Sequence, residues 1–141
     1  MAGSLAIYSC KKLLDHLFNK AAWSAPTIKV ALSTADPGED GAGLAEPSGN
    51  NYSRVATTGS TWVAATSADP SVIMNALQVL FPTPSGAWGL QTHFALMDGD
   101  SANVVGSGTL RDPTNTYDLP QQIVSGNIIS FEPGQLALSL D

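Results

Sequence analysis

The stretch that decides the fold is residues 27–56, which read TIKVALS, then TADPGEDGAGLAEPSGNN, then YSRVA. In the first segment Ile28, Val30 and Leu32 alternate with small or polar residues, which is the period-two pattern of a half-buried β-strand. The second segment has no apolar periodicity, and a loop of this length in a compact domain usually has a function or is disordered. The stretch therefore predicts a strand, a long acidic loop over residues 35–50 and a returning strand.

Further strands follow the same short pattern, and turn residues separate them. The expected strands are residues 27–33, 53–58, 61–65, 76–81, 91–98, 103–110, 122–124, 128–131 and 135–140. Turn-forming residues mark the reversals at Gly59-Ser60, Asp98-Gly99-Asp100, Ser125-Gly126-Asn127 and Glu132-Pro133-Gly134. Short strands at such spacing predict a mainly β fold, either an antiparallel β-sandwich or a barrel-like domain.

Residues 1–20 are the segment that predicts an N-terminal α-helix. Ser4 is the expected N-cap, and Asn19 suits the C-terminal end. The helix has one apolar stripe, which consists of Leu13, Leu14, Leu17 and Phe18. Two interpretations of the stripe are open, since it either packs on the sheet of its own chain or docks on another protein.

The composition is poor in charge for a globular chain. Apolar residues make up 43% of the 141 residues and charged residues 13%, against about 25% charged residues in an average domain. A chain of this length forms one domain, residues 1–141, with a substantial core. A neutral surface needs little desolvation when other protein covers it. The composition thus fits an assembly component, and equally a β-rich domain with polar, uncharged loops.

The charge is divided unevenly along the chain. The first 30 residues hold four lysines and one aspartate, a net charge of +3, so the rest carries −9 of the total of −6. An acidic body repels phosphates, so we expect no nucleic-acid partner, whereas the basic segment can steer toward an acidic partner. No run approaches the roughly 18 apolar residues of a membrane span. The N-terminus also lacks the residue order of a signal peptide, which predicts a protein kept in the cytoplasm or assembled there.

Residue types that carry catalysis or bind metals are sparse. His16, His93 and Cys10 are the only histidines and the only cysteine, and a zinc site needs three or four converging ligands. No GxSxG motif is present, and the glycines beside Ser107 precede no expected helix, so the geometry of a phosphate loop is missing. We therefore expect that the protein is not an enzyme and binds no cofactor, and that both histidines have structural roles.

The acidic loop permits one metal hypothesis. Asp36, Glu39, Asp40 and Glu46 are interleaved with glycines, and calcium prefers oxygen ligands on flexible loops of this kind. Their spacing is not that of an EF-hand. Asp36, Glu39 and Asp40 are the calcium candidates. The alternatives are a solvated acidic loop, or a loop that pairs with lysine or arginine of a neighbouring subunit.

Trp88 lies in a turn with glycine on both sides, Gly86-Ala87-Trp88-Gly89. A tryptophan in such a turn either packs under the loop as a lid on the core or is exposed as a contact anchor. Sugar-binding sites also use exposed rings. Trp88 is therefore an interface candidate, together with the apolar stripe of the expected helix.

Two segments carry a family resemblance, namely LSTADPGEDGAGLAEPSGNNYSRVA at residues 32–56 and GAWGLQTHFALMD at residues 86–98. With the strands and turns around them, they resemble small virion structural proteins of tailed bacteriophages, which are described as head decoration or tail-fibre proteins. The resemblance implies a virion component that is assembled in the host cytoplasm.

The sequence favours a capsid decoration or cement protein, which binds between subunits of the major capsid protein as a homotrimer. A stable contact of this class buries on the order of 1,200–2,000 Å², and uncharged surfaces suit it because buried unpaired charges are costly. The first alternative is a tail-fibre or receptor-contacting tail protein, and the second is a carbohydrate-binding module.

Overall fold

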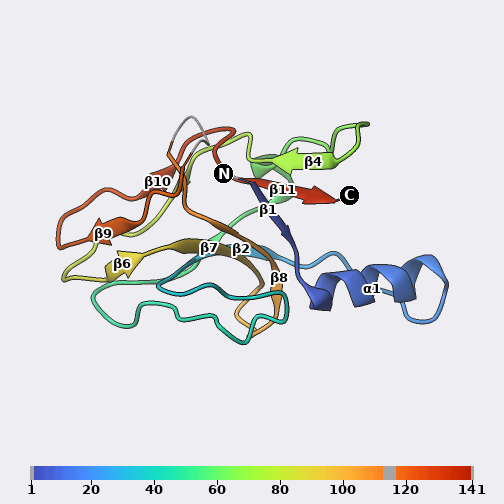
Figure 1. The fold of residues 1–141 in the computed structure, drawn as a ribbon, viewed down its shortest axis with the longest axis horizontal. Coiled ribbons are helices and arrows are strands. Elements are labelled where there is room, and N and C mark those ends of the chain that lie inside the picture. The colour runs from blue at the N-terminus through green and yellow to red at the C-terminus, as the bar shows by residue number, and fades with distance from the viewer. Residues whose placement is uncertain (1, 113–116, 141) are drawn as a thin grey trace.

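The computed structural model describes residues 2–112 and 117–140, and most of its elements are strands (Figure 1). In chain order the elements are β1 (Ala2–Leu5), α1 (Ile7–Leu17), β2 (Ile28–Ser33), β3 (Val55–Ala56), the 3₁₀ helix η1 (Gly59–Thr61), β4 (Ser71–Met74), β5 (Val79–Leu80), β6 (Gly89–Gln91), β7 (His93–Asp98), β8 (Val104–Thr109), β9 (Gln121–Ile123), β10 (Ser130–Phe131) and β11 (Ala137–Leu140).

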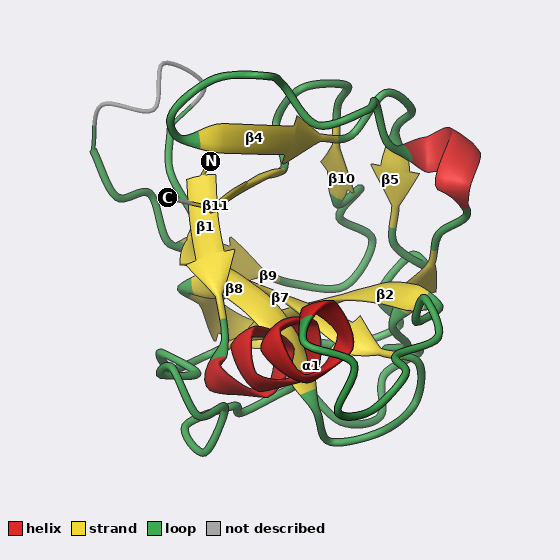
Figure 2. Ribbon diagram, turned by 90° about the vertical axis from the view of Figure 1, so that its right-hand side faces the viewer, coloured by secondary structure: helices red, strands yellow, loops and turns green. Residues whose placement is uncertain are grey.

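Seven strands form one sheet in the order β3-β2-β7-β8-β1-β11-β4. Neighbouring strands are antiparallel except β1 and β11, which are parallel. Seen along the long axis, the sheet curls like part of a barrel, and the short pair β10-β5 lies on the side between β4 and β2 (Figure 2). The predicted mainly β, barrel-like fold with one N-terminal helix is confirmed.

The central strand β7 is buried on both faces. Phe94 and Leu96 pack into the main core, whereas Met97 on the opposite face packs in a smaller cluster with Ala6, against which Leu44 of the acidic loop lies. The neighbouring strand β2 is likewise buried over its last four residues. The expectation of a half-buried strand is therefore wrong for this part of β2, because protein covers the face that the alternation assigned to solvent.

The helix predicted at residues 1–20 starts later than expected, because the first residues form β1. Both edges of β1 are paired, with Ser4 opposite Ser107 of β8 and opposite Ser139 of β11. Ser4 is therefore a strand residue and not the N-cap, and α1 begins at Ile7. Backbone pairing on both sides stabilises the extended conformation of this segment over a helical one.

The C-terminal end of α1 lies where the sequence predicts it. Asn19 has a φ of 54°, and the N–H groups of Asn19 and Lys20 donate to the carbonyls of His16 (3.2 Å) and Asp15 (2.7 Å). These bonds form the Schellman arrangement, in which a residue in the left-handed conformation ends a helix.

Two expectations about strands are wrong. Residues 61–65 form no strand, because η1 turns the chain and reciprocal hydrogen bonds between Thr58 and Thr61 hold the turn. Trp62 makes only an isolated bridge, to Asn75. Strand β4 was not predicted, and it pairs with the C-terminal strand β11. Its partner lies far along the chain, where a local pattern carries no signal.

The other expected strands are present, several of them shortened. Strands β2, β8 and β11 match their expected segments closely, β9 is shifted by one residue, and β3, β5 and β10 are shorter than expected. The segment at residues 91–98 contains the end of β6 and all of β7. The predicted hairpin at residues 98–100 is confirmed, since Gly99, with a φ of 60°, lies in the turn from β7 to β8.

We predict that Gly3→Ala lowers the free energy of unfolding by about 1–3 kcal/mol. A methyl group on Gly3 would collide with the carbonyl oxygen of Ser107, so β1 would have to move away from β8. Chemical denaturation measures the change. Gly59→Ala is the control, because a methyl group there meets nothing within 4 Å. An equal loss in both variants would contradict the close approach of β1 and β8.

Candidate functional site

Helix α1 extends away from the β-sheet into solvent (Figure 1). Ser9 is its only buried residue. The exposed fractions of Leu14, Leu17 and Phe18 are 56%, 67% and 71%, and Leu13 is half-buried. The predicted apolar stripe is thus present, and most of it does not pack on the sheet of its own chain.

The first turn of α1 is fixed to the body by hydrogen bonds. The N–H of Ile7 donates to the carbonyl of Glu39 at 2.8 Å, and the hydroxyl of Ser9 donates to the carbonyl of Val105 at 2.8 Å. The hydroxyl of Tyr8 donates to Asp98 at 2.5 Å. This hydrogen bond, with smaller contributions from burial and from the charge of Asp98, raises the pKa of Tyr8. These contacts set the direction of the helix, so the apolar stripe is presented outward.

The segment that follows α1 returns along it. The ring of Trp23 meets that of Tyr8 edge to face, with centroids 6.3 Å apart, and the N–H of Trp23 donates to Nδ1 of His16 at 3.2 Å. His16 therefore has a structural hydrogen-bond partner, as the sequence predicted.

Cys10, also on α1, is an exposed free thiol.

Trp88 is a core residue. Its exposed fraction is 5%, and its indole N–H donates to the carbonyl of Asn50 at 2.9 Å. The ring packs edge to face on Tyr52, with centroids 5.1 Å apart. Trp88 therefore acts as the lid that the sequence permitted, and the expectation that it anchors an interface is wrong for this fold.

An ion pair braces the acidic loop. Arg54 donates to both carboxylate oxygens of Glu46, at 2.7 Å from Nη2 and 3.0 Å from Nε, and its Nη1 donates to the carbonyls of Gly99 (3.0 Å) and Ser101 (2.6 Å). The hydrogen bond to Glu46 raises the pKa of Arg54 above its ordinary value. One guanidinium thus joins the acidic loop to the turn between β7 and β8.

Tyr52 completes this brace. Its hydroxyl donates to Glu46 at 2.9 Å and accepts the N–H of Leu32 at 3.1 Å. Burial raises the pKa of Tyr52 well above its ordinary value, and the nearby carboxylate of Glu46 raises it further. The loop is therefore tied to β2 through a neutral phenol that keeps its proton.

The remaining acids of the loop face different surroundings. Asp36 and Asp40 each accept a backbone N–H two residues further on, at 2.9 Å, and Glu39 lines a pocket. Within residues 2–112 and 117–140, no three acidic, histidine or cysteine side chains are arranged to hold a metal ion. The calcium interpretation of Asp36, Glu39 and Asp40 gains no support from this geometry.

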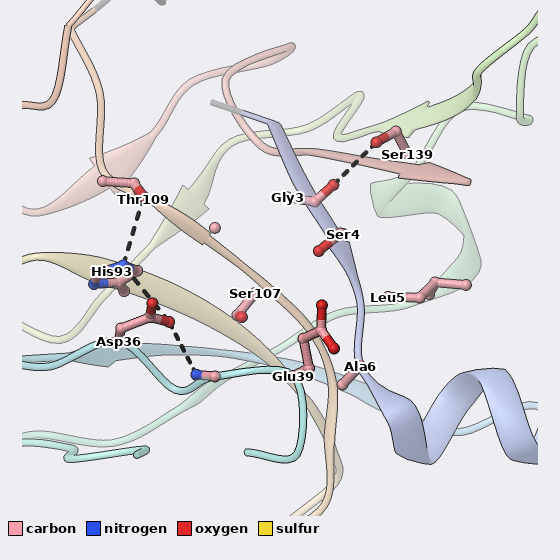
Figure 3. A pocket seen from close by; sticks show the side chains of 12 residues that line it. Gly3, Ser4, Leu5, Ala6, Asp36, Glu39, His93, Ser107, Thr109 and Ser139 are labelled. Atoms are coloured by element: carbon pink, nitrogen blue, oxygen red, sulfur yellow. Dashed lines mark hydrogen bonds and ion pairs between the residues drawn. The ribbon is translucent and has the colours of Figure 1, made fainter. Parts of the chain in front are cut away.

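A polar pocket of about 440 Å³ lies between the acidic loop and the sheet (Figure 3). The side chains labelled around it include Asp36, Glu39, His93, Ser4, Ser107, Thr109 and Ser139. Nδ1 of His93 lies 2.8 Å from the Thr92 hydroxyl, and Nε2 lies 3.5 Å from the Thr109 hydroxyl and 3.8 Å from Asp36. The groups around the pocket can donate and accept hydrogen bonds, and His93 has the structural partners that the sequence predicted.

Sequence analysis did not identify this pocket. Its serines come from β1, β8 and β11, which are neighbours in the sheet although more than a hundred residues separate the first from the other two. Ser107 and Ser139 lie in expected strands, and Ser4 lies in a segment that the sequence predicted as the start of a helix. No signal in the sequence alone brings them together, because that requires knowing which strands pair.

Comparison with known proteins identifies a family. The model of the family described as podophage GP4 fiber I protein gp80 matches residues 4–139. No protein of curated function matches the chain significantly. In the described part of the chain, no helix has both the length and the apolar composition needed to cross a membrane.

We predict that Arg54→Met lowers the free energy of unfolding by roughly 2–4 kcal/mol, because Glu46 loses its counter-ion in a site that water reaches poorly. Lys29→Met is the matched control. It breaks a pair with Asp100, whose side chain is 84% exposed, and should cost less than about 1 kcal/mol. Chemical denaturation of both variants measures the difference, and equal costs would show that Arg54 does not brace the loop.

We also predict that stability falls as pH rises through about 10 and above, in part because of Tyr52. The raised pKa of Tyr52 means that the unfolded phenol ionises first, so its contribution is complete below the unfolded pKa and is lost above it. The free energy of unfolding of Tyr52→Phe should therefore depend less on pH between about pH 9 and 11. Tyr117→Phe removes an exposed phenol and is the control. Parallel pH profiles for wild type and Tyr52→Phe would contradict this.

Proposed function

The chain belongs to the podophage GP4 fiber I protein family and is a component of the virion, and we propose that it serves there as a structural part of a tail fibre. The observation that carries the proposal is the match over residues 4–139, which includes α1 and nearly all of the sheet. A structural protein of this kind associates with other virion proteins. We propose that it works through such contacts and not through catalysis.

The family supports the fibre alternative better than the capsid decoration that the sequence favoured. The family is described as a fibre protein, and nothing in the match refers to a capsid or to the major capsid protein. The carbohydrate-binding alternative relied on Trp88 at an exposed tip. Because Trp88 is buried, its ring cannot stack on a sugar in this fold, and we propose the fibre role over a sugar-binding one.

We propose α1 as the docking element of the chain. Leu14, Leu17 and Phe18 are exposed on a helix whose first turn is fixed, so little order is lost when a partner covers them. Burying each side chain contributes about 1–2 kcal/mol before the cost of association is subtracted. The low charge of the chain also favours contact with protein. We also propose that the chain associates with further copies of itself, for which the sequence-based prediction is a trimer.

The location and number of copies in the particle test this function. We expect an antibody against the chain to label the tail region in electron micrographs of purified virions. Quantitative mass spectrometry should then find a few to a few dozen copies per particle, as a set of fibres requires. Label spread over the head, with hundreds of copies per particle, would contradict a fibre and support decoration.

A further inference from the structure

We propose that helix α1 of one copy docks in an apolar groove beside β9 and β10 of a second copy, so that copies join head to tail. This inference rests on the proposed structural role and names the partner of α1. The donor surface is the exposed stripe already described, which lies on a helix that extends from the body (Figure 1).

The acceptor surface is an open groove of about 500 Å³. Its lining includes the buried core residues Leu110, Ile123 and Phe131. Ile128, which also lines it, has an exposed fraction of 82%. The rest of the lining is mixed, with apolar Leu32, Leu119 and Ile129 beside polar or charged Arg111, Gln121, Gln122, Asn127, Ser130 and Gln135. A groove with an apolar floor, exposed apolar side chains and polar groups around them can accept an amphipathic helix, apolar face inward.

The groove and the helix lie at opposite ends of the molecule. In Figure 1 α1 is at one end of the long axis, and β9 and β10 are at the other end; Figure 2 looks along this axis from the helix. The bonds of Tyr8 to Asp98 and of Ser9 to Val105 hold the first turn of α1 on the body. The helix therefore does not reach the groove of its own chain, so a helix α1 that fills this groove has to come from another copy.

The charges of the two surfaces are complementary. Lys11, Lys12 and Lys20 lie on α1 or just after it, with Asp15 as the one acid, whereas the chain beyond residue 30 carries a net charge of −9. Beside the groove, Asp118 precedes the lining residue Leu119, and Glu132 follows the lining residue Phe131. Arg111 also lines the groove and its Nε lies 3.5 Å from Asp118, so these two charges offset each other and Glu132 leaves the rim with a net charge of −1. The helix segment, with a net charge of +2, and this rim therefore attract each other, whereas two helix segments repel.

A contact between two different surfaces has a consequence for assembly. Such a heterologous contact closes a ring when the rotation between copies allows it, and otherwise continues as an open chain. A rotation of 120° would give the expected trimer. Surfaces at opposite ends of the long axis favour the open chain, which is an elongated arrangement.

Two variants with separate defects test the proposal. Leu14→Gln/Leu17→Gln removes the apolar stripe and keeps residues that favour a helix, and Ile128→Glu places a charge at the rim of the groove. Both sites are exposed, so folding should be unaffected, which circular dichroism and the melting temperature check. Val63→Gln, at an exposed apolar position outside both surfaces, is the matched control.

Sedimentation velocity of the full chain measures association. Wild type and Val63→Gln should form oligomers that grow with concentration or close at three copies. Each defective variant alone should associate on the order of tenfold more weakly or worse. An equimolar mixture of the two defective variants should form dimers and nothing larger, because the intact helix of one fits the intact groove of the other.

Other outcomes would overturn the proposal. If Ile128→Glu associates like wild type while the helix variant does not, the helices contact each other or another surface. If wild type is monomeric at all concentrations, α1 does not serve self-association. Capture of a different virion protein by α1 would then identify the partner of the helix. Neither result affects the location and copy number in the particle, so failure of this inference is distinguishable from failure of the fibre role.

Discussion

The structure depends on the insertion of β1 between β8 and β11. Without β1 the sheet would consist of two separate parts, β3-β2-β7-β8 and β11-β4. The insertion requires close approach of the backbones, and a glycine at position 3 permits it, because a side chain there would collide with the carbonyl oxygen of Ser107. Since α1 follows β1 after one residue, the same pairing decides where the helix leaves the body. The two backbone pairings of β1 thus join the parts of the sheet and decide where the helix leaves the body.

The acidic loop has a structural role that its amino-acid composition does not indicate. Glu46 pairs with Arg54 and accepts the hydroxyl of Tyr52, and Leu44 packs against the smaller apolar cluster. The loop therefore covers the second face of the central strands. Its acids divide between bracing the loop, capping tight turns and lining the polar pocket. A local excess of charge indicated a metal or a partner, whereas much of it is used within the chain.

The low overall charge and the exposed helix have the same physical consequence. A body with few charges costs little to desolvate, and an apolar stripe held away from the sheet gains free energy only when another protein covers it. A fibre protein needs contacts that are stable in the assembled particle. The chain places its most exposed apolar stripe on a helix that is fixed at its base, and an apolar groove lies at the opposite end of the molecule.

The sequence by itself determined the mainly β class, β2, the hairpin of β7 and β8, the end of α1 at Asn19 and the apolar stripe of the helix. These features depend on local periodicity and turn chemistry, which a short window of residues contains. Only the tertiary structure decided that residues 2–5 form a strand, that Trp88 is buried, that serines of β1, β8 and β11 share a pocket and that the stripe faces solvent. The reason is that each depends on contacts between segments far apart in the sequence, such as the pairing of Ser4 with Ser107 or the packing of Trp88 on Tyr52, which no local pattern encodes.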